Sequence, residues 1–181
     1  RNFIHTNLRL RDQLKDAGIK SYPKVDLSWI TKNVKPYNFK KYAILIPGGS
    51  KKRKYKRIPI FFFNEIIKKL LAKKIKPILV GSKDDESVCK QINKYNSSVL
   101  NLCSKLDVFE LAMLGKKSKI VIGNDTGPMH LMAQLDCFTL SLFTKYSDPS
   151  LCGPQGKNVN ILNIDNYDLT TKSIEKMINN C

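Results

Sequence analysis

The stretch SKIVIGNDTGPMHLMAQL, residues 118–135, decides the fold that we expect for this chain. Its first part, SKIVIGN, is a short apolar run that is typical of a buried β-strand. Its last part, GPMHLMAQL, has apolar residues in a helical pattern and a proline, Pro128, near the position where helices begin. The polar residues Asn-Asp-Thr connect the two parts. A strand that leads through a short turn into a helix is the unit from which parallel sheets are built.

The same alternation extends in both directions from this stretch. Such alternation predicts an α/β fold, a doubly wound parallel six-stranded Rossmann-like sheet with helices on both faces and the strand order 3-2-1-4-5-6. The last helix would be capped by Thr170 or Thr171. Residues 147–158 contain proline and glycine and indicate a loop. The expected strands are residues 42–49, 76–81, 97–102, 118–124, 137–143 and 159–164, and the expected helices are residues 58–74, 84–95, 106–117, 127–135 and 170–180.

The first forty residues follow a different pattern. Residues 5–19 have the spacing of a short amphipathic helix, and residues 20–38 contain two prolines and no clear period, which is typical of a linker. We therefore expect a helix and linker in residues 1–40 and a Rossmann-like domain in residues 41–181. Because the chain begins with Arg1 and not with methionine, we expect that part of a longer protein precedes it.

The composition narrows the classes of partner. The 181 residues carry a formal net charge of +17, which a phosphorylated ligand, an anionic membrane surface or a nucleic acid would complement. However, 27 of the 32 basic residues are lysines, which is typical of amino-acid drift in an AT-rich genome, whereas specific phosphate and base contacts favour arginine. We therefore expect no nucleic-acid partner. No apolar run approaches the roughly 20 residues that a membrane-spanning helix needs.

The cysteines do not indicate a metal site or a disulfide framework. Their number, five, is odd, and no CxxC pair occurs. We expect most of them to be small core residues of a protein in a reducing compartment, and we expect no metal site. They are Cys89, Cys103, Cys137, Cys152 and Cys181.

Two unusual loops follow the first and fourth expected strands. In the predicted strand order these strands are neighbours, so PGGSKKRKYKR (residues 47–57) and GNDTGPMH (residues 123–130) should meet at the carboxyl edge of the sheet. The start of the helix after Gly127 and the nearby cations suit a phosphate. Each feature also has an ordinary explanation, such as a helix cap or a solvated loop. The glycine-rich motifs GxGxxG and GxxxxGK[ST] are absent, so the residues alone indicate an α/β domain with a phosphate or nucleotide ligand.

The order of several segments resembles glycosyltransferase family 9, the ADP-heptose:lipopolysaccharide heptosyltransferases. IVIGNDTGPMHLMAQL resembles the family signature, in which a strand leads to Asp-Thr-Gly, two variable residues and His. IPGGSKKRKYKRIP, LVGSKDDESV, LCSKLDVFELAMLGKKSKIVI and LFTKYSDPSLCGPQG resemble its other segments, and together they cover roughly residues 42–163. The resemblance implies the C-terminal half of a GT-B fold, which binds the nucleotide sugar, and it places the general base in a domain outside this chain.

The resemblance also implies roles for particular residues. Three positions depart from the family pattern: Ile58 replaces Trp, Thr144 replaces Gly and Met132 replaces a small residue. The implied donor and phosphate contacts are Ser50, Lys56, Asp125, Thr126, Gly127 and His130, and the implied nucleoside contacts are Asp85, with Asp84 and Glu86 within alignment error, and the backbone of Cys103.

By this resemblance, the chain would be half of an inverting glycosyltransferase that transfers a sugar from a nucleotide-diphosphate donor, ADP-heptose, to a lipopolysaccharide or similar glycan. It would need no cofactor and would be inactive alone. The expected location is cytoplasmic, at the inner face of the inner membrane of a Gram-negative bacterium, with peripheral contact to anionic lipid. Two alternatives are a nucleotide- or nucleic-acid-binding protein without transferase activity, and another sugar-nucleotide enzyme such as an epimerase.

Overall fold

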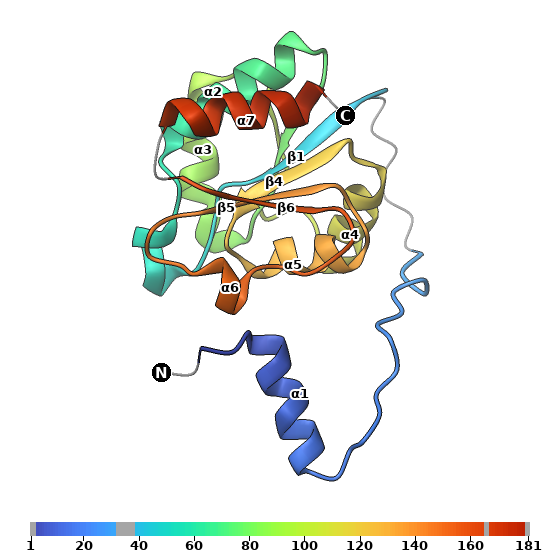
Figure 1. Ribbon diagram of the computed structural model, residues 1–181. Coiled ribbons are helices and arrows are strands. Elements are labelled where there is room, and N and C mark those ends of the chain that lie inside the picture. Colours follow the sequence, from blue (N-terminus) through green and yellow to red (C-terminus); the bar gives the residue numbers. More distant parts are fainter. Residues whose placement is uncertain (1–2, 32–38, 165–166, 180–181) are drawn as a thin grey trace.

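The computed structural model describes residues 3–31, 39–164 and 167–179 (Figure 1). A six-stranded parallel sheet forms its centre, and helices lie on both faces. The strands are β1 (Tyr42–Ile46), β2 (Lys76–Leu79), β3 (Leu100–Asn101), β4 (Ile120–Asn124), β5 (Thr139–Phe143) and β6 (Val159–Asn163). The helices are α1 (Thr6–Asp16), α2 (Ile60–Ala72), α3 (Glu86–Tyr95), α4 (Val108–Lys117), α5 (Gly127–Gln134), α6 (Pro149–Cys152) and α7 (Tyr167–Asn179), with short 3-10 helices η1 (Lys51–Lys56) and η2 (Lys83–Asp85).

The strand order is β3-β2-β1-β4-β5-β6, which confirms the predicted order. All neighbouring strands are parallel, and β1 lies between β2 and β4, where Ile44 pairs with both Ile78 and Val121. The chain therefore reverses its direction of winding between β1 and β4. Their carboxyl ends form the switch point at which doubly wound sheets bind ligands.

The sheet has apolar side chains on both faces, and a layer of helices covers each face. Every residue of β1, β4 and β5 is buried, as expected for strands that are covered on both sides. One core cluster joins the sheet to α2, α3 and α7, and a second joins it to α4 and α5. In α2, Phe63, Ile67 and Leu70 recur at helical spacing and are fully buried, and each such side chain contributes roughly 1.5–3 kcal/mol.

Three local features differ from the sequence-based expectation. The helix α6 lies inside the expected loop of residues 147–158, where the Asp148 side chain accepts a hydrogen bond from Ser150 N and Pro149 takes the first helical position. The basic segment of residues 51–56 forms the 3-10 helix η1. The helix α7 begins at Tyr167 and contains residues 170 and 171 in its interior, so the predicted N-cap there is wrong.

The helix α1 lies outside the two core clusters. None of its residues is buried, and it meets the sheet domain beside α6 (Figure 1). Residues 17–31 have no regular helix or strand, while residues 32–38 of the expected linker lie outside the described residues. Within the described ranges, every helix is too short or too polar to cross a lipid bilayer.

Four of the five cysteines fall within the described part of the chain, and all four are free thiols. Cys89, Cys103 and Cys137 are buried, as expected of small core residues, and Cys152 is partly exposed. Cys181 lies outside the described residues.

Candidate functional site

The loops that follow β1 and β4 are joined by a buried amide. Asn124, at the end of β4, is only 2% exposed. Its side-chain NH₂ donates to the carbonyls of Pro47 (2.7 Å) and Gly48 (2.9 Å), and its side-chain oxygen accepts from Ile58 N (3.3 Å). Because a buried amide must be hydrogen-bonded, Asn124 fixes the glycine loop against the end of β4. In the sequence, the only signal for this role is a polar residue at the end of an apolar strand.

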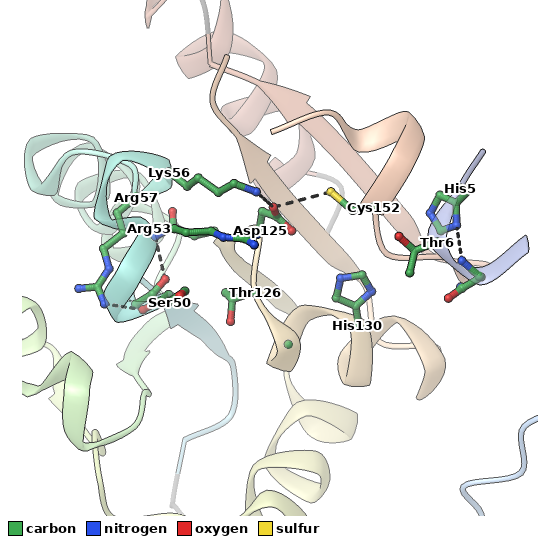
Figure 2. A pocket seen from close by; sticks show the side chains of 15 residues that line it. His5, Thr6, Ser50, Arg53, Lys56, Arg57, Asp125, Thr126, His130 and Cys152 are labelled. Carbon is green, nitrogen blue, oxygen red and sulfur yellow. Dashed lines mark hydrogen bonds and ion pairs between the residues drawn. The ribbon is translucent and has the colours of Figure 1, made fainter. Parts of the chain in front are cut away.

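A pocket of about 350 Å³ opens where these loops meet (Figure 2). The structure brings together in its lining the six residues implied as donor and phosphate contacts, from Ser50 to His130. The other lining residues come from the glycine loop, η1 and the residue after it, the end of β4, α6, and the N-cap and first turn of α1. They are His5, Thr6, Asn7, Gly48, Gly49, Arg53, Arg57, Asn124 and Cys152.

One cation in this pocket is held by a carboxylate. Lys56 Nζ lies 3.2 Å from Asp125 Oδ2 and 3.0 Å from Ser147 Oγ, and the Ser147 hydroxyl donates to the same carboxylate oxygen. The two charged side chains are only 18% and 12% exposed. The pair therefore keeps the ammonium group at a fixed place on the pocket wall. Asp125 is occupied in holding Lys56 and is not a free anion in the pocket.

The segment that carries Lys56 is also fixed from outside the pocket. Tyr55, in η1, and Tyr146, in the loop after β5, pack edge to face with ring centroids 5.4 Å apart. Such a pair contributes about 0.5–1.5 kcal/mol beyond the apolar area that it buries. The position of Lys56 therefore depends on two loops that are distant in sequence.

The first turn of α5 is open towards the pocket. Thr126 is the N-cap residue, but its side chain makes no capping hydrogen bond, so neither Asp125 nor Thr126 forms the side-chain cap considered from the sequence. A Cβ atom placed on Gly127 would meet no heavy atom within 4 Å. The start of a helix carries unpaired N–H groups and a partial positive charge. This open helix start can therefore receive an anion.

His130 lies one turn into α5 and is partly buried against the pocket. Burial lowers the pKa of His130 below its ordinary value; the nearby Asp125 opposes this shift, and His5 adds to it. The imidazole is therefore neutral at pH 7. It can donate or accept a hydrogen bond, but it does not add a cation to the site.

A second pocket, of about 420 Å³, adjoins the first and shares with it Gly48, Gly49, Ser50 and Thr126. Its walls are mainly apolar and come from the ends of β1 to β3 and from α4, with acidic residues at Asp84, Asp85 and Asp107. Cys103 does not line it, whereas the adjacent Leu102 does. The Cys103 thiol instead contacts the carbonyl of Ser82 at 3.2 Å.

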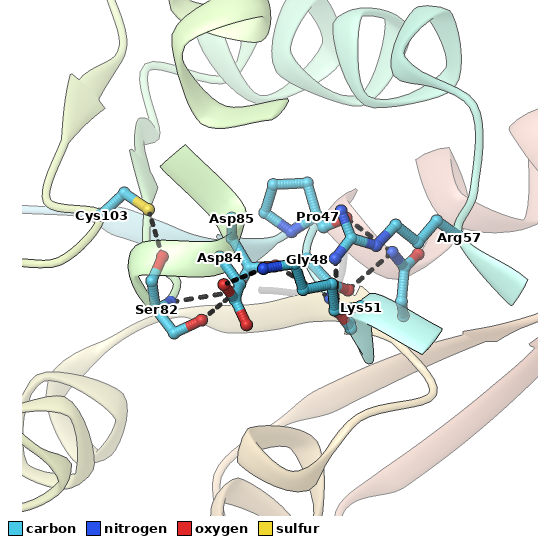
Figure 3. Close-up of polar contacts among 10 residues, drawn as sticks. Pro47, Gly48, Lys51, Arg57, Ser82, Asp84, Asp85 and Cys103 are labelled. Carbon is cyan, nitrogen blue, oxygen red and sulfur yellow. Dashed lines mark hydrogen bonds and ion pairs between the residues drawn. The ribbon is translucent and has the colours of Figure 1, made fainter. Parts of the chain in front are cut away.

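Asp85 is engaged in internal bonds (Figure 3). One carboxylate oxygen accepts from Gly49 N and Arg57 (both 3.2 Å), and the other accepts from the backbone (3.0 Å) and hydroxyl (2.9 Å) of Ser82. Asp85 is 7% exposed. The neighbouring Asp84 side chain is 54% exposed and forms an ion pair with Lys51 at 3.5 Å. The two acids therefore occupy different environments, and the nucleoside role implied for Asp85 stays a prediction.

Several solved structures share this fold. Escherichia coli heptosyltransferase WaaC with ADP has a TM-score of 0.73 and 23% identity, over 99% of this chain and 57% of that one. E. coli ADP-heptose lps heptosyltransferase II has a TM-score of 0.69 and 20% identity, over 80% and 47% of the two chains. A family 9 glycosyltransferase from Veillonella parvula DSM 2008 has a TM-score of 0.68 and 16% identity, over 98% and 53%. This chain thus spans about half the length of these proteins.

The sequence comparison identifies the family. No curated protein matches the chain. The model of glycosyltransferase family 9 (heptosyltransferase) matches residues 4–181. Because this match covers nearly the whole sequence, the chain belongs to glycosyltransferase family 9.

Proposed function

We propose that the chain is the donor-binding half of a heptosyltransferase-like enzyme, which transfers a sugar from a nucleotide-diphosphate donor, with ADP-heptose expected, to a lipopolysaccharide-type acceptor. One observation carries the proposal: a cation-lined pocket at an open helix start adjoins an apolar pocket, and the glycine loop lies between them. A nucleotide sugar has this same order of parts, with an apolar base, an anionic diphosphate and a polar sugar. The solved relative that contains ADP supports the proposal.

In this proposal the diphosphate lies at the junction of the two pockets. Ser50 and Thr126 line both of them and offer hydroxyl groups. Lys56 and the first turn of α5 supply positive charge to the phosphate oxygens. The base enters the apolar pocket beside Leu102 and Leu106, and the exposed Asp84 is placed to accept a hydrogen bond from the ribose.

The proposed reaction needs charge stabilisation at the leaving group. The acceptor oxygen bonds to the anomeric carbon as the bond from that carbon to the diphosphate oxygen breaks, and the electron pair leaves with the nucleoside diphosphate. A base in a domain outside this chain takes the acceptor proton, so we expect this chain alone to be inactive. Lys56 and the α5 N–H groups would stabilise the developing negative charge, and one such donor is worth on the order of 2.7–4 kcal/mol. We propose no cofactor, and a cytoplasmic location with peripheral membrane contact stays a prediction.

Gly127→Ala tests the open helix start. The added methyl group meets no protein atom, and alanine favours helix over glycine, so we expect unfolding by urea to be unchanged or slightly shifted to higher concentration. The same methyl group would occupy the space proposed for the diphosphate, and we expect ADP binding to weaken about tenfold, as for a loss of about 1.4 kcal/mol. Calorimetry measures the affinity. Full-strength ADP binding by this variant would contradict a diphosphate at Gly127.

Calorimetry of the unaltered chain with ADP, UDP and GDP tests the proposed function itself. We expect at least one of them, ADP first, to bind at micromolar to millimolar concentration. No binding of any of the three at millimolar concentration would refute a donor-binding domain. Tight, steeply salt-dependent binding of RNA or DNA that competes with ADP would instead favour the nucleic-acid-binding alternative.

A further inference from the structure

The first turn of α1 forms one wall of the first pocket. His5, Thr6 and Asn7 line this pocket together with Asp125, His130 and Cys152 (Figure 2). They do not line the apolar pocket proposed for the nucleoside. They also lie far away in the sequence from the other lining residues. A segment outside the Rossmann-like domain therefore completes the site.

Four hydrogen bonds attach this turn to the segment around α6. His5 Nε2 lies 3.1 Å from the Gly153 carbonyl, the Thr6 hydroxyl donates to the Leu151 carbonyl at 3.0 Å, and the Asn7 amide donates to Gln155 at 2.9 Å. Gln155 Nε2 also lies 3.4 Å from His5 Nδ1. These three residues of α1 and its cap are partly buried, whereas residues 8–16 are all exposed. The attachment is thus concentrated at the pocket, next to Cys152.

The two ends of the pocket differ in charge. Figure 2 shows Arg53 and Arg57 at one end and His5, Thr6 and His130 at the other, while the Lys56 ammonium group and the Cys152 thiol both lie beside the Asp125 carboxylate between them. At the second end, burial lowers the pKa of His130, and Thr6 offers a hydroxyl group. The end with the two arginines suits phosphate. The end with hydrogen-bonding side chains suits a group with many hydroxyls.

Groups for such contacts remain at the α1 end. The Thr6 hydroxyl uses its proton on Leu151, and its oxygen can still accept a hydrogen bond. The Asn7 side-chain carbonyl accepts no hydrogen bond from any residue in the described ranges. His5, by contrast, has both ring nitrogens engaged and serves to position the turn.

We propose that the first turn of α1 contacts the sugar of the donor, with Thr6 and Asn7 as sugar-contacting residues and His5 as a positioning residue. This inference rests on the proposed function. It assigns part of the sugar preference to a segment that precedes the Rossmann-like domain. The nucleoside and diphosphate would not contact this segment.

The test compares two probes, ADP and ADP-heptose, by calorimetry on the unaltered chain and on Thr6→Val and Asn7→Ala. We expect each variant to lose about three- to tenfold in affinity for ADP-heptose, the effect of one hydrogen bond, and to bind ADP within about twofold of the unaltered chain. Gln13→Ala removes an amide from the exposed part of the same helix and should change neither affinity. Equal losses for both probes, or no loss for either, would overturn the inference.

A second measurement does not depend on a variant. Cys152 lies in the same pocket, and its alkylation by N-ethylmaleimide can be followed by mass spectrometry of its peptide. The Cys152 thiol lies 3.9 Å from the Asp125 oxygen that holds Lys56, so ADP itself should slow this alkylation, and ADP-heptose should slow it several-fold more at matched occupancy. Equal protection by the two probes would place the sugar elsewhere and overturn the inference. Failure of both probes to bind would instead refute the donor-binding proposal.

Discussion

Replacing Lys56 with alanine is expected to weaken ADP binding about 10- to 100-fold, which corresponds to the 1.5–3 kcal/mol typical of a hydrogen bond to a charged group. Lys56 Nζ is held at the pocket wall by Asp125 and Ser147, so little side-chain entropy is lost when it binds phosphate. The variant also leaves the Asp125 carboxylate without its cation beside an anionic ligand. Calorimetry with ADP measures the loss.

Lys54→Ala is the matched control for this experiment. Lys54 lies in the same 3-10 helix, is exposed and does not line the pocket, and its removal changes the net charge by the same amount. We expect ADP binding by this variant to stay within about twofold, since exposed charges are screened at physiological salt. Equal losses for Lys54→Ala and Lys56→Ala would show that general surface charge, and not a positioned ammonium group, attracts the ligand.

Lys56→Ala can weaken ADP binding in two ways: the ammonium group is missing, and the Asp125 carboxylate is left without its cation. The double variant Lys56→Ala with Asp125→Asn separates these two effects. If part of the loss comes from the uncompensated Asp125 carboxylate, removing its charge should recover part of the ADP affinity. The two residues are in contact, so their effects should not add. Strict additivity would contradict the view that Asp125 acts by holding Lys56.

The sheet could be predicted from the sequence because its signals are periodic and local. Short apolar runs between helical patterns gave all six strands, and rules of connection gave their order. From that order alone, the glycine loop and the turn at Asp125 were expected to meet, and they line one pocket. The helix α6 was missed although Asp148-Pro149 is an N-cap and first-turn signal, because proline and glycine in the same segment indicated a loop.

The parts of the site that were not predicted depend on individual polar contacts between distant segments. The attachment of α1 joins residues about 145–150 positions apart, and no period in either segment indicates it. Asn124 and Asp125 are adjacent polar residues in the sequence, yet one fixes the glycine loop and the other holds Lys56. Only the three-dimensional arrangement shows that such adjacent residues have different roles.

Asp84 and Asp85 are a second pair of adjacent residues with different roles. We expect Asp85→Ala to lower the stability of the fold and Asp84→Ala to leave it nearly unchanged. Asp85→Ala leaves the N–H groups of Gly49 and Ser82 and the Arg57 guanidinium without their shared acceptor. Because removing one partner of a largely buried ion pair typically costs 3–5 kcal/mol and this pair is slightly exposed, we expect the free energy of unfolding in urea to fall by about 3 kcal/mol.

Gly48 and Gly81 provide the space that the Asp85 side chain occupies. A Cβ atom on Gly48 would overlap the Asp85 carboxyl group, and one on Gly81 would lie 2.8 Å from its Cβ, so both glycines leave room for Asp85. Asp84→Ala is the matched control, since the ion pair with Lys51 that it breaks is exposed and should cost less than about 1 kcal/mol. If Asp84 accepts the ribose hydroxyl, that variant should instead weaken ADP binding. Loss of ADP binding at unchanged stability in Asp85→Ala would reverse the two assignments, because it would make the buried carboxylate the nucleoside ligand.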